Sequence, residues 1–402
     1  MNNDQLNSTQ ELLAAAKKSI LFTTIRPDIV MEKGQGLFLW EKKKKKYLDF
    51  VGGWAVTSLG HSPAAIAQAL EKQSRVLVNA SPSFLNKPMI EYAKILTDYS
   101  CLDRVFFASS GAEANEGAIK LARKYGSTRL GGAYEIITTI NSFHGRTLAT
   151  MSATGKQKWK DLYEPKVPGF IHVPLNDFAA LQAAVTAKTC AIMLEPIQGE
   201  GGVFELEPDY IRKVRDLCNE KKILLIFDEV QTGLARTGKL FAYEHYGVEP
   251  DVMTLAKGIG GGFPLAALLT KEQFNIFEIG DQGGTYSGQP LAMAVGLAVM
   301  NEVLEKKLAD NAAKQGEYLQ QQLRQIASRF GLTNIRGKGL LIAFDLPTDK
   351  GSEIVGACLG KGLLVNSPQP AMIRLMPPLI VTAEDIDAMM AILSGVLEDV
   401  LP

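Results

Sequence analysis

The sequence predicts an α/β fold, in which a large domain with a mainly parallel, doubly wound sheet is joined to a smaller α+β domain formed from both termini. Three observations support this prediction. Between about residues 100 and 270, short apolar segments alternate with amphipathic ones, as strands and helices do in such sheets. Glycine-rich and polar turns follow the apolar segments. After Asp310 the composition changes to helical patterns followed by short strands.

The composition excludes several classes of protein. The 402 residues are 46% hydrophobic and 21% charged, as in soluble globular proteins. Lys plus Arg and Asp plus Glu number 43 each, so the net charge gives no reason to expect nucleic acid or an anionic membrane as a partner. The four cysteines and four histidines lack metal-ligand spacing, so we expect reduced thiols and no metal site.

Neither a signal peptide nor a membrane segment is expected. Residues 1–18 are polar and then amphipathic, without a basic start and an apolar core. The longest apolar stretches, such as residues 290–300, are shorter than the ~20 residues that span a bilayer. We therefore expect a cytoplasmic enzyme.

The amino-terminal part predicts a hairpin. Residues 36–40 and 47–51 are strand-like, and the run of lysines at 42–46 is typical of a solvated turn rather than a binding patch. Two glycines then precede Trp54 and allow the backbone to pass close to another group. That group is substrate in one interpretation, and in the other Trp54 simply belongs to the core.

Residues 104–110 predict a buried strand, and the segment from Gly111 to Arg123 predicts the helix that follows it. Ser110, Gly111 and Ala112 lie at the junction, where free N–H groups face outward and the positive end of the helix lies behind them. This arrangement is typical of a phosphate-binding turn. Small residues at such a junction also serve close packing between strand and helix.

Two further strands, residues 135–140 and 189–196, end in polar turns. The first leads to Phe143, His144 and Arg146, which combine an aromatic face, an imidazole and a guanidinium suited to a carboxylate. The second leads to Glu200 among glycines. Because the carboxyl ends of parallel strands lie at one edge of a sheet, these side chains are expected to face one ligand.

The most informative pair is Asp228 and Lys257. Asp228 ends the apolar run 223–228, and Lys257 follows the short strand 251–256. Pyridoxal phosphate (PLP) needs both groups, because a lysine holds its aldehyde as a Schiff base and a buried carboxylate keeps its ring nitrogen protonated. In the alternative interpretation, Asp228 caps a helix and Lys257 is a solvated loop residue.

The carboxyl-terminal part predicts a strand at 265–270, a glycine-rich loop at 283–290 and helices at 291–307 and 312–330. Strands are expected at 339–344 and 371–376. Thr382 begins a last helix in the manner of a capping box, with Asp385 in place of the usual glutamate.

Five motifs, at residues 110–116, 143–147, 195–202, 228–233 and 255–258, have the order and spacing of the class III, PLP-dependent aminotransferases. The chain resembles most closely the acetylornithine/ornithine subgroup, from Gly36 to the final helix. The resemblance implies PLP fold type I. It also implies an amino-terminal segment and hairpin (1–57) in the small domain, a large PLP-binding domain (58–308) and a carboxyl-terminal α+β small domain (309–402).

The resemblance also implies roles for the cofactor site. Lys257 would form the Schiff base and later carry a proton, and Asp228 would hold the pyridinium proton. Thr285 would reach the phosphate of the neighbouring subunit's cofactor, which implies a homodimer with shared active sites. The cofactor-binding set is Ser110, Gly111, Ala112, Phe143, His144, Glu195, Asp228, Val230, Gln231, Lys257 and Thr285.

For the substrate, Arg146 matches the family position that binds one carboxylate. Arg374 matches the second substrate arginine, which Glu200 would cover until a dicarboxylic acid arrives; a structural salt bridge is the alternative. Trp54 stands at a pocket position that is small in acetylornithine enzymes, and Gly284 stands where the subgroup has a serine. These two departures suggest an altered donor pocket.

The resemblance implies ping-pong transamination, in which the terminal amino group of N-acetylornithine or a related ω-amino acid passes to 2-oxoglutarate and yields glutamate. The donor stays open among N-acetylornithine, 4-aminobutyrate, ornithine, a diamine and a biosynthetic intermediate. An aminomutase or lyase on the same cofactor is a second interpretation, and a catalytically silent binding protein is a third. The intact Lys257 and Asp228 disfavour the third.

Overall fold

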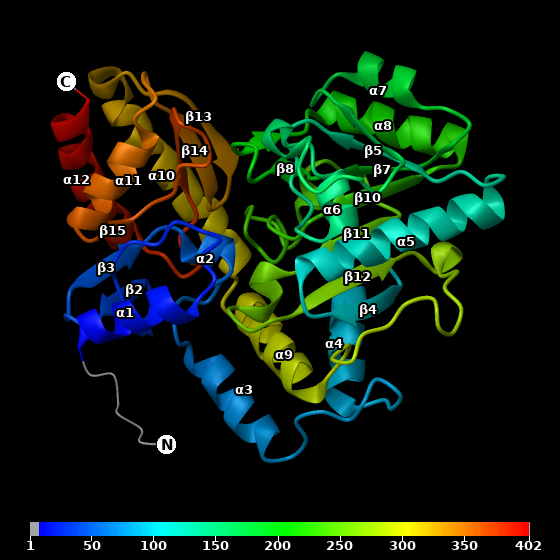
Figure 1. Cartoon of the computed structure of the whole chain (residues 1–402), viewed down its shortest axis with the longest axis horizontal. Helices are drawn as coiled ribbons and strands as arrows, with labels where there is room; N and C mark the ends of the chain where they lie inside the picture. Colours follow the sequence, from blue (N-terminus) through cyan, green and yellow to red (C-terminus); the bar gives the residue numbers. More distant parts are fainter. Residues whose placement is uncertain (1–7, 402) are drawn as a thin grey trace.

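The computed structural model describes residues 8–401, and a seven-stranded sheet lies at the centre of this part of the chain (Figure 1). β12 is antiparallel to both of its neighbours, and the other six strands run in one direction. The predicted mainly parallel α/β sheet is therefore confirmed. In spatial order the strands are β4 (Arg104–Ala108), β12 (Ala266–Thr270), β11 (Val252–Leu255), β10 (Leu224–Asp228), β7 (Thr189–Leu194), β5 (Glu135–Thr139) and β6 (Phe170–Val173).

The sheet is covered on both faces because its central strands are apolar at successive positions. In β10, Leu224 and Ile226 share a cluster with α5 (Gly111–Arg129). Leu225 and Phe227 share another with α8 (Pro208–Lys221). Successive side chains of a strand point to opposite faces, so this division places α5 and α8 on opposite sides of the sheet. α5 continues six residues beyond the predicted end at Arg123.

Two smaller sheets lie beside the central one. The first combines strands from both ends of the described chain, and the second contains strands from the carboxyl-terminal part alone. β15 (Leu363–Leu364) pairs in parallel with β3 (Lys46–Asp49), which continues the antiparallel series β1 (Met31–Gln35), β2 (Phe38–Glu41) and β3. The other sheet contains β13 (Thr333–Lys338), β14 (Leu341–Asp345) and β16 (Met372–Leu375). The exact partition at residues 57 and 308 stays a prediction.

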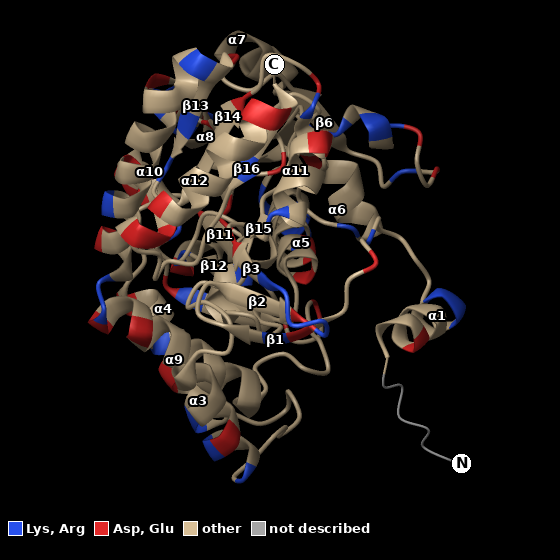
Figure 2. Ribbon diagram, turned by 90° about the vertical axis from the view of Figure 1, so that its left-hand side faces the viewer, with Lys and Arg blue, Asp and Glu red and all other residues tan. Residues whose placement is uncertain are grey.

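Helices α10 (Leu308–Phe330), α11 (Gly351–Gly360) and α12 (Ala383–Val400) cover these smaller sheets, and α12 begins with the predicted capping box of Thr382 and Asp385. Acidic and basic residues are interspersed along the outer helices (Figure 2), as the balanced net charge leads one to expect. None of the helices within residues 8–401 combines the length and apolar character that a bilayer crossing requires.

The other helices and strands complete the fold of residues 8–401. They are α1 (Thr9–Ser19), α2 (Gly52–Ala55), α3 (Ala64–Ser74), α4 (Lys87–Asp98), α6 (Leu148–Ala153), α7 (Phe178–Ala184), β8 (Ile197–Gln198), β9 (Phe204–Glu205) and α9 (Pro290–Glu305), with single 3-10 turns that include η1 (Gln157–Trp159) and η3 (Lys257–Gly260).

Candidate active site

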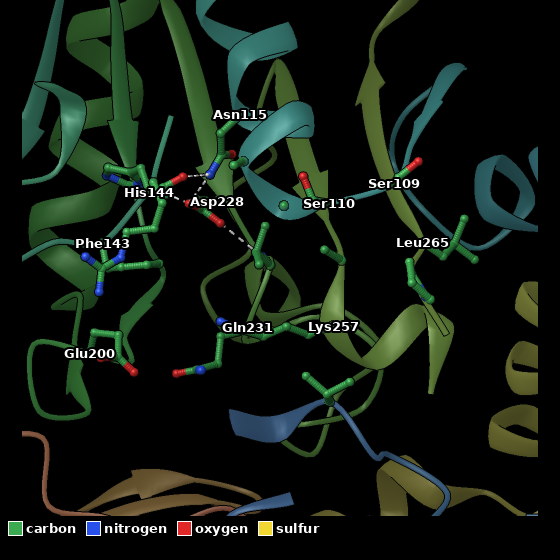
Figure 3. A pocket seen from close by; sticks show the side chains of 18 of the residues that line it. Ser109, Ser110, Asn115, Phe143, His144, Glu200, Asp228, Gln231, Lys257 and Leu265 are labelled. Atoms are coloured by element: carbon green, nitrogen blue, oxygen red, sulfur yellow. Dashed lines mark hydrogen bonds and ion pairs between the residues drawn. The ribbon is translucent and has the colours of Figure 1, made fainter. Parts of the chain in front are cut away.

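A cavity of about 370 Å³ lies at the carboxyl edge of the central sheet, where the loops after β4, β5, β7, β10 and β11 meet (Figure 3). The structure thus brings together Ser110 and Lys257, which are 147 residues apart in the sequence. The predicted residues that line the cavity are Ser110, Gly111, Ala112, Phe143, His144, Arg146, Glu195, Glu200, Asp228, Val230, Gln231 and Lys257.

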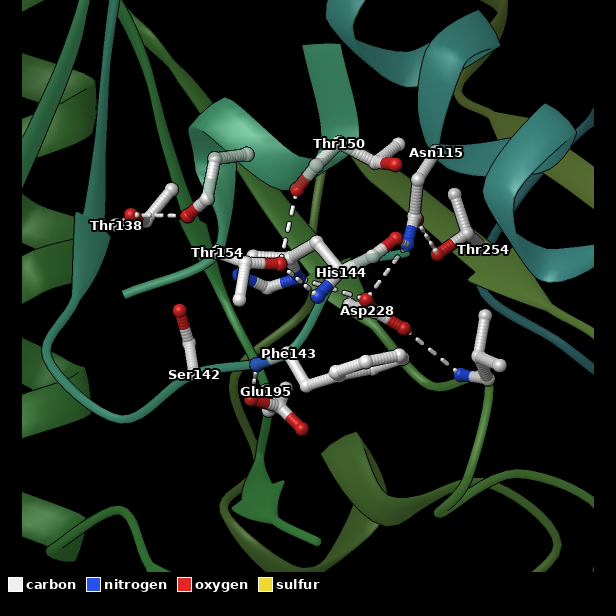
Figure 4. A network of polar contacts seen from close by, with 12 residues as sticks. Asn115, Thr138, Ser142, Phe143, His144, Thr150, Thr154, Glu195, Asp228 and Thr254 are labelled. Atoms are coloured by element: carbon white, nitrogen blue, oxygen red, sulfur yellow. Dashed lines mark hydrogen bonds and ion pairs between the residues drawn. The ribbon is translucent and has the colours of Figure 1, made fainter. Parts of the chain in front are cut away.

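Asp228, the last residue of β10, is fixed by three donors (Figure 4). Asn115 Nδ2 and His144 Nδ1 each lie 2.7 Å from Asp228 Oδ2, and the N–H of Val230 donates to Oδ1 at 3.0 Å. Thr254 Oγ1 in turn donates to Asn115 Oδ1 at 2.6 Å. Asp228 is almost fully buried, so these hydrogen bonds hold a carboxylate in one orientation beside the cavity.

The imidazole of His144 responds to this carboxylate. Burial alone would lower the pKa of His144, but the hydrogen bond and the charge of Asp228 outweigh burial, and the pKa is raised. Burial raises the pKa of the neighbouring Glu195 to about 7, against the opposing charge of His144. Glu195 accepts hydrogen bonds from the N–H groups of Phe143 and Gly199, at 3.0 and 3.3 Å, and so ties the loops after β5 and β7 together.

Lys257 follows β11, which pairs directly with β10, so the lysine and Asp228 project from neighbouring strand ends. Among residues 8–401, Lys257 Nζ makes no hydrogen bond and no ion pair. Burial lowers the pKa of Lys257, and the nearby charges of Asp228 and Glu200 offset this only in part. The arrangement supplies a reactive amine and a fixed carboxylate at one cavity, which contradicts the interpretation of Lys257 as a solvated loop residue.

The amino terminus of α5 forms another part of the cavity lining. Ser110 is its N-cap and accepts from the N–H of Glu113 at 3.3 Å, while Glu113 accepts from the N–H of Ser109 at 3.0 Å. Within the described residues, the N–H groups of Gly111 and Ala112 have no protein acceptor. A Cβ on Gly111 would lie 2.8 Å from Val230 Cγ1, so only glycine fits here. The turn is suited to bind an anion.

Arg374, on β16, is fully buried and contacts two residues that line the cavity, Glu200 and Gln231. Its Nη2 lies 2.7 Å from Glu200 Oε1. The guanidinium of Arg374 also donates hydrogen bonds to three neutral oxygens, Asn366 Oδ1, Gly199 O and Gln231 Oε1. Burial opposes ionisation of Glu200, but the charge and hydrogen bond of Arg374 lower its pKa to about 2.

Arg146 lies against aromatic rings. Its Cζ is 4.0 Å from the ring centroid of Trp159 and 5.9 Å from that of Phe143. The two rings meet edge to face at 5.8 Å. A guanidinium stacked in this way has a defined plane while its N–H groups stay available to a carboxylate.

Four predicted site residues are not among those that line this cavity: Arg374, which contacts the lining residues Glu200 and Gln231, and Trp54, Gly284 and Thr285. Trp54 is half exposed and contributes only its backbone carbonyl, which accepts from Gln231 Nε2 at 3.3 Å. The close approach at Gly52 is to the chain itself, since a Cβ there would lie 2.8 Å from the carbonyl of Met376. Gly284 and Thr285 lie in an exposed loop elsewhere on the chain.

Sequence reasoning missed three residues of the site. Asn115 was assigned only to a helix, although its amide is 1% exposed and bonded to Asp228. Lys156 forms an ion pair with Glu200 at 3.3 Å, and Trp159 supports Arg146. The sequence offered one indication of the role of Asn115. This polar residue lies four positions after Gly111 and therefore on the same, inner face of the predicted helix.

Comparison with known proteins agrees with this geometry. The family model for aminotransferase class-III matches residues 23–397. The chain is 48% identical over 391 residues to the acetylornithine aminotransferase of Caldanaerobacter subterraneus subsp. tengcongensis, which covers 97% of this chain and 100% of that protein. Among solved structures, the ornithine aminotransferase of Toxoplasma gondii ME49 superposes with a TM-score of 0.94 at 30% identity, covering 98% of this chain and 96% of the other. The acetylornithine aminotransferase of Elizabethkingia anophelis superposes with a TM-score of 0.86 at 31% identity, covering 97% and 99%.

Proposed function

Because the chain belongs to the class-III aminotransferases, we propose that it moves the terminal amino group of N-acetylornithine, or of a related ω-amino acid, to 2-oxoglutarate. The observation that carries the proposal is the pairing of a fixed carboxylate, Asp228, with an unpaired amine, Lys257, at the ends of neighbouring strands. Relatives named as acetylornithine aminotransferases supply the choice of donor.

The residues of the cavity fit PLP. Lys257 has the free amine for a covalent Schiff base, and the orientation of Asp228 suits a protonated ring nitrogen. The free N–H groups of Gly111 and Ala112, with the helix N-terminus behind them, suit the phosphate. When bound, PLP would supply an electron sink for the carbon that loses its proton.

The protein's own residues would then perform two tasks. Lys257 would take a proton from the substrate carbon and deliver it to the cofactor, a role that suits an amine with a lowered pKa. Arg146 would bind one substrate carboxylate, and Arg374 would bind a second once Glu200 moves away. A donor with one carboxylate and an acceptor with two could therefore use the same cavity in turn, which gives ping-pong kinetics.

We infer further that the protein acts as a homodimer in which Thr285 reaches the partner's cofactor phosphate. Thr285 lies away from the cavity of its own chain, in an exposed loop. Ile279 and Tyr286 nearby expose large apolar surface, which a second copy would cover. Sedimentation velocity at micromolar concentration tests this inference, and a monomeric holoenzyme would contradict it.

The function is tested by a half-reaction screen. The PLP-loaded protein is mixed separately with N-acetylornithine, ornithine, 4-aminobutyrate, lysine and putrescine, and the loss of the cofactor's absorbance is followed. We expect N-acetylornithine to react fastest and Lys257→Ala to react with none. A faster reaction with another amine would identify that amine as the donor. It would also support the inference that Trp54 and Gly284 mark an altered donor pocket. Normal turnover by Lys257→Ala would refute the proposed chemistry.

A further inference from the structure

Glu200 lies between two cations, and the family resemblance accounts for only one of them. Its Oε1 is 2.7 Å from Arg374 Nη2, and its Oε2 is 3.3 Å from Lys156 Nζ. Lys156 belongs to the segment after α6, and its ammonium lies 5.0 and 5.3 Å from the ring centroids of Phe143 and Trp159. Each carboxylate oxygen of Glu200 thus has its own positively charged partner.

The two cations depend on Glu200 to different extents. Arg374 also donates to Asn366 Oδ1 at 2.8 and 3.0 Å and to Gly199 O at 2.7 Å, contacts that do not involve Glu200. The ammonium of Lys156, in contrast, has Glu200 as its one hydrogen-bonding and ion-pair partner among residues 8–401. The guanidinium therefore has acceptors besides Glu200, whereas no second carboxylate of the described residues lies within ion-pair distance of the ammonium.

A substrate carboxylate can take the place of Glu200 on Arg374 only if Glu200 moves. The side chain of Glu200 is three-quarters buried, and a carboxylate at such a depth is costly to leave without a counter-charge. A turn toward Lys156 would keep one ion pair intact throughout, because that contact already exists. Burial lowers the pKa of Lys156, and the charge and hydrogen bond of Glu200 offset this effect in part, so the ammonium form of Lys156 is favoured by its contact with Glu200.

We propose that Lys156 determines specificity for dicarboxylic acids by holding Glu200 whenever a substrate carboxylate occupies Arg374. This role rests on the proposed function, since it needs an acceptor with two carboxylates. Lys156 acts through Glu200 and is a positioning residue. Without Lys156, Glu200 would stay on Arg374, and the second carboxylate of the acceptor could not bind Arg374.

Calorimetric titration of the PLP-loaded protein with glutarate, a dicarboxylate without a keto group, tests this role, and butyrate serves as the monocarboxylate reference. We expect Lys156→Met to raise the Kd of glutarate about tenfold more than that of butyrate. Lys156→Arg keeps the charge and should restore the affinity to within about threefold. Lys158→Met is the matched control, since this exposed lysine is two residues away and has no ion pair within the described residues; it should leave both Kd values unchanged.

The Glu200→Gln background separates action through Glu200 from direct contact with the ligand. There, Lys156→Met should change the Kd of glutarate less than twofold, because the carboxylate that Lys156 holds is gone. A persistent tenfold effect would mean that Lys156 contacts the ligand itself and would overturn the proposal, as would an unchanged Kd in the wild-type background. If the wild-type protein binds glutarate no better than butyrate, the dicarboxylate acceptor is wrong, and the role of Lys156 is wrong with it.

Discussion

Replacing Asn115 with alanine tests whether the orientation of Asp228 controls catalysis. The substitution removes the donor at 2.7 Å from Asp228 Oδ2, the hydrogen bond to the carbonyl of His144 at 2.7 Å and the acceptor of Thr254. A hydrogen bond to a charged group contributes about 1.5–3 kcal/mol. Since about 1.4 kcal/mol corresponds to a factor of ten, the loss of the Asp228 contact alone predicts a decrease in kcat/KM of about 10- to 100-fold.

The assay is steady-state kcat/KM for N-acetylornithine at saturating 2-oxoglutarate, with the Kd of PLP measured by absorbance in parallel. Asn311→Ala is the matched control, because Asn311 Nδ2 likewise donates to two acceptors, the carbonyls of Leu379 and Val381, but Asn311 does not line the cavity. We expect it to lower thermal stability while kcat/KM stays within about threefold. If Asn115→Ala behaves like this control, the orientation of Asp228 does not depend on Asn115.

Two further predictions concern charge. Arg146→Ala should raise the KM of amino acids that carry a carboxylate far more than the KM of simple amines such as putrescine, and equal effects would argue against carboxylate binding. Burial raises the pKa of Glu229 to about 7, so its stabilising contribution is present below pH ~4.5 and is lost as the pH rises through 7. In urea unfolding between pH 5 and 7.5, the wild-type free energy of unfolding should fall by about 2 kcal/mol more than that of Glu229→Gln; parallel curves would contradict this.

The strands that carry the site were predictable because they are buried on both faces. Residues 190–194 and 224–227 are apolar at successive positions, and such short runs are typical of strands in a sheet covered on both sides. Once the strands are known, the direction of the chain shows which residues lie at the carboxyl edge of the sheet, where ligands bind. This is why residues such as Ser110, Glu200 and Lys257 could be grouped before any distance was known.

Other parts of the site depend on side-chain directions that spacing does not specify. Asn115 and Glu116 are adjacent in α5, yet Asn115 faces Asp228 while Glu116 accepts from Thr147 Oγ1. Lys156 and Lys158 look equivalent in the sequence, but only the first is turned inward, beside Phe143 and Glu200. Helical phase and loop geometry decide these cases, and neither can be read from residue type.

Trp54 illustrates a further limit. Its position beside two glycines left open a place near substrate or in the core, but its own φ of 62° lies in the left-handed region. Such a backbone is uncommon for a bulky residue and costs on the order of 1–2 kcal/mol. In the described chain the turn sends the side chain outward, where it is half exposed, and leaves only the carbonyl to meet Gln231.

The position of Arg374 explains why the two smaller sheets matter to the chemistry. Arg374 lies on β16, whereas Glu200, Gly199 and Gln231 come from loops of the central sheet. Every one of these contacts therefore joins the two parts of the molecule across the cavity wall. Because one carboxylate would replace another, exchange of Glu200 for a substrate carboxylate would leave the number of charges around the guanidinium unchanged. The cavity could then accept one or two carboxylates without any rearrangement of the sheets, and only one acidic side chain would need to move.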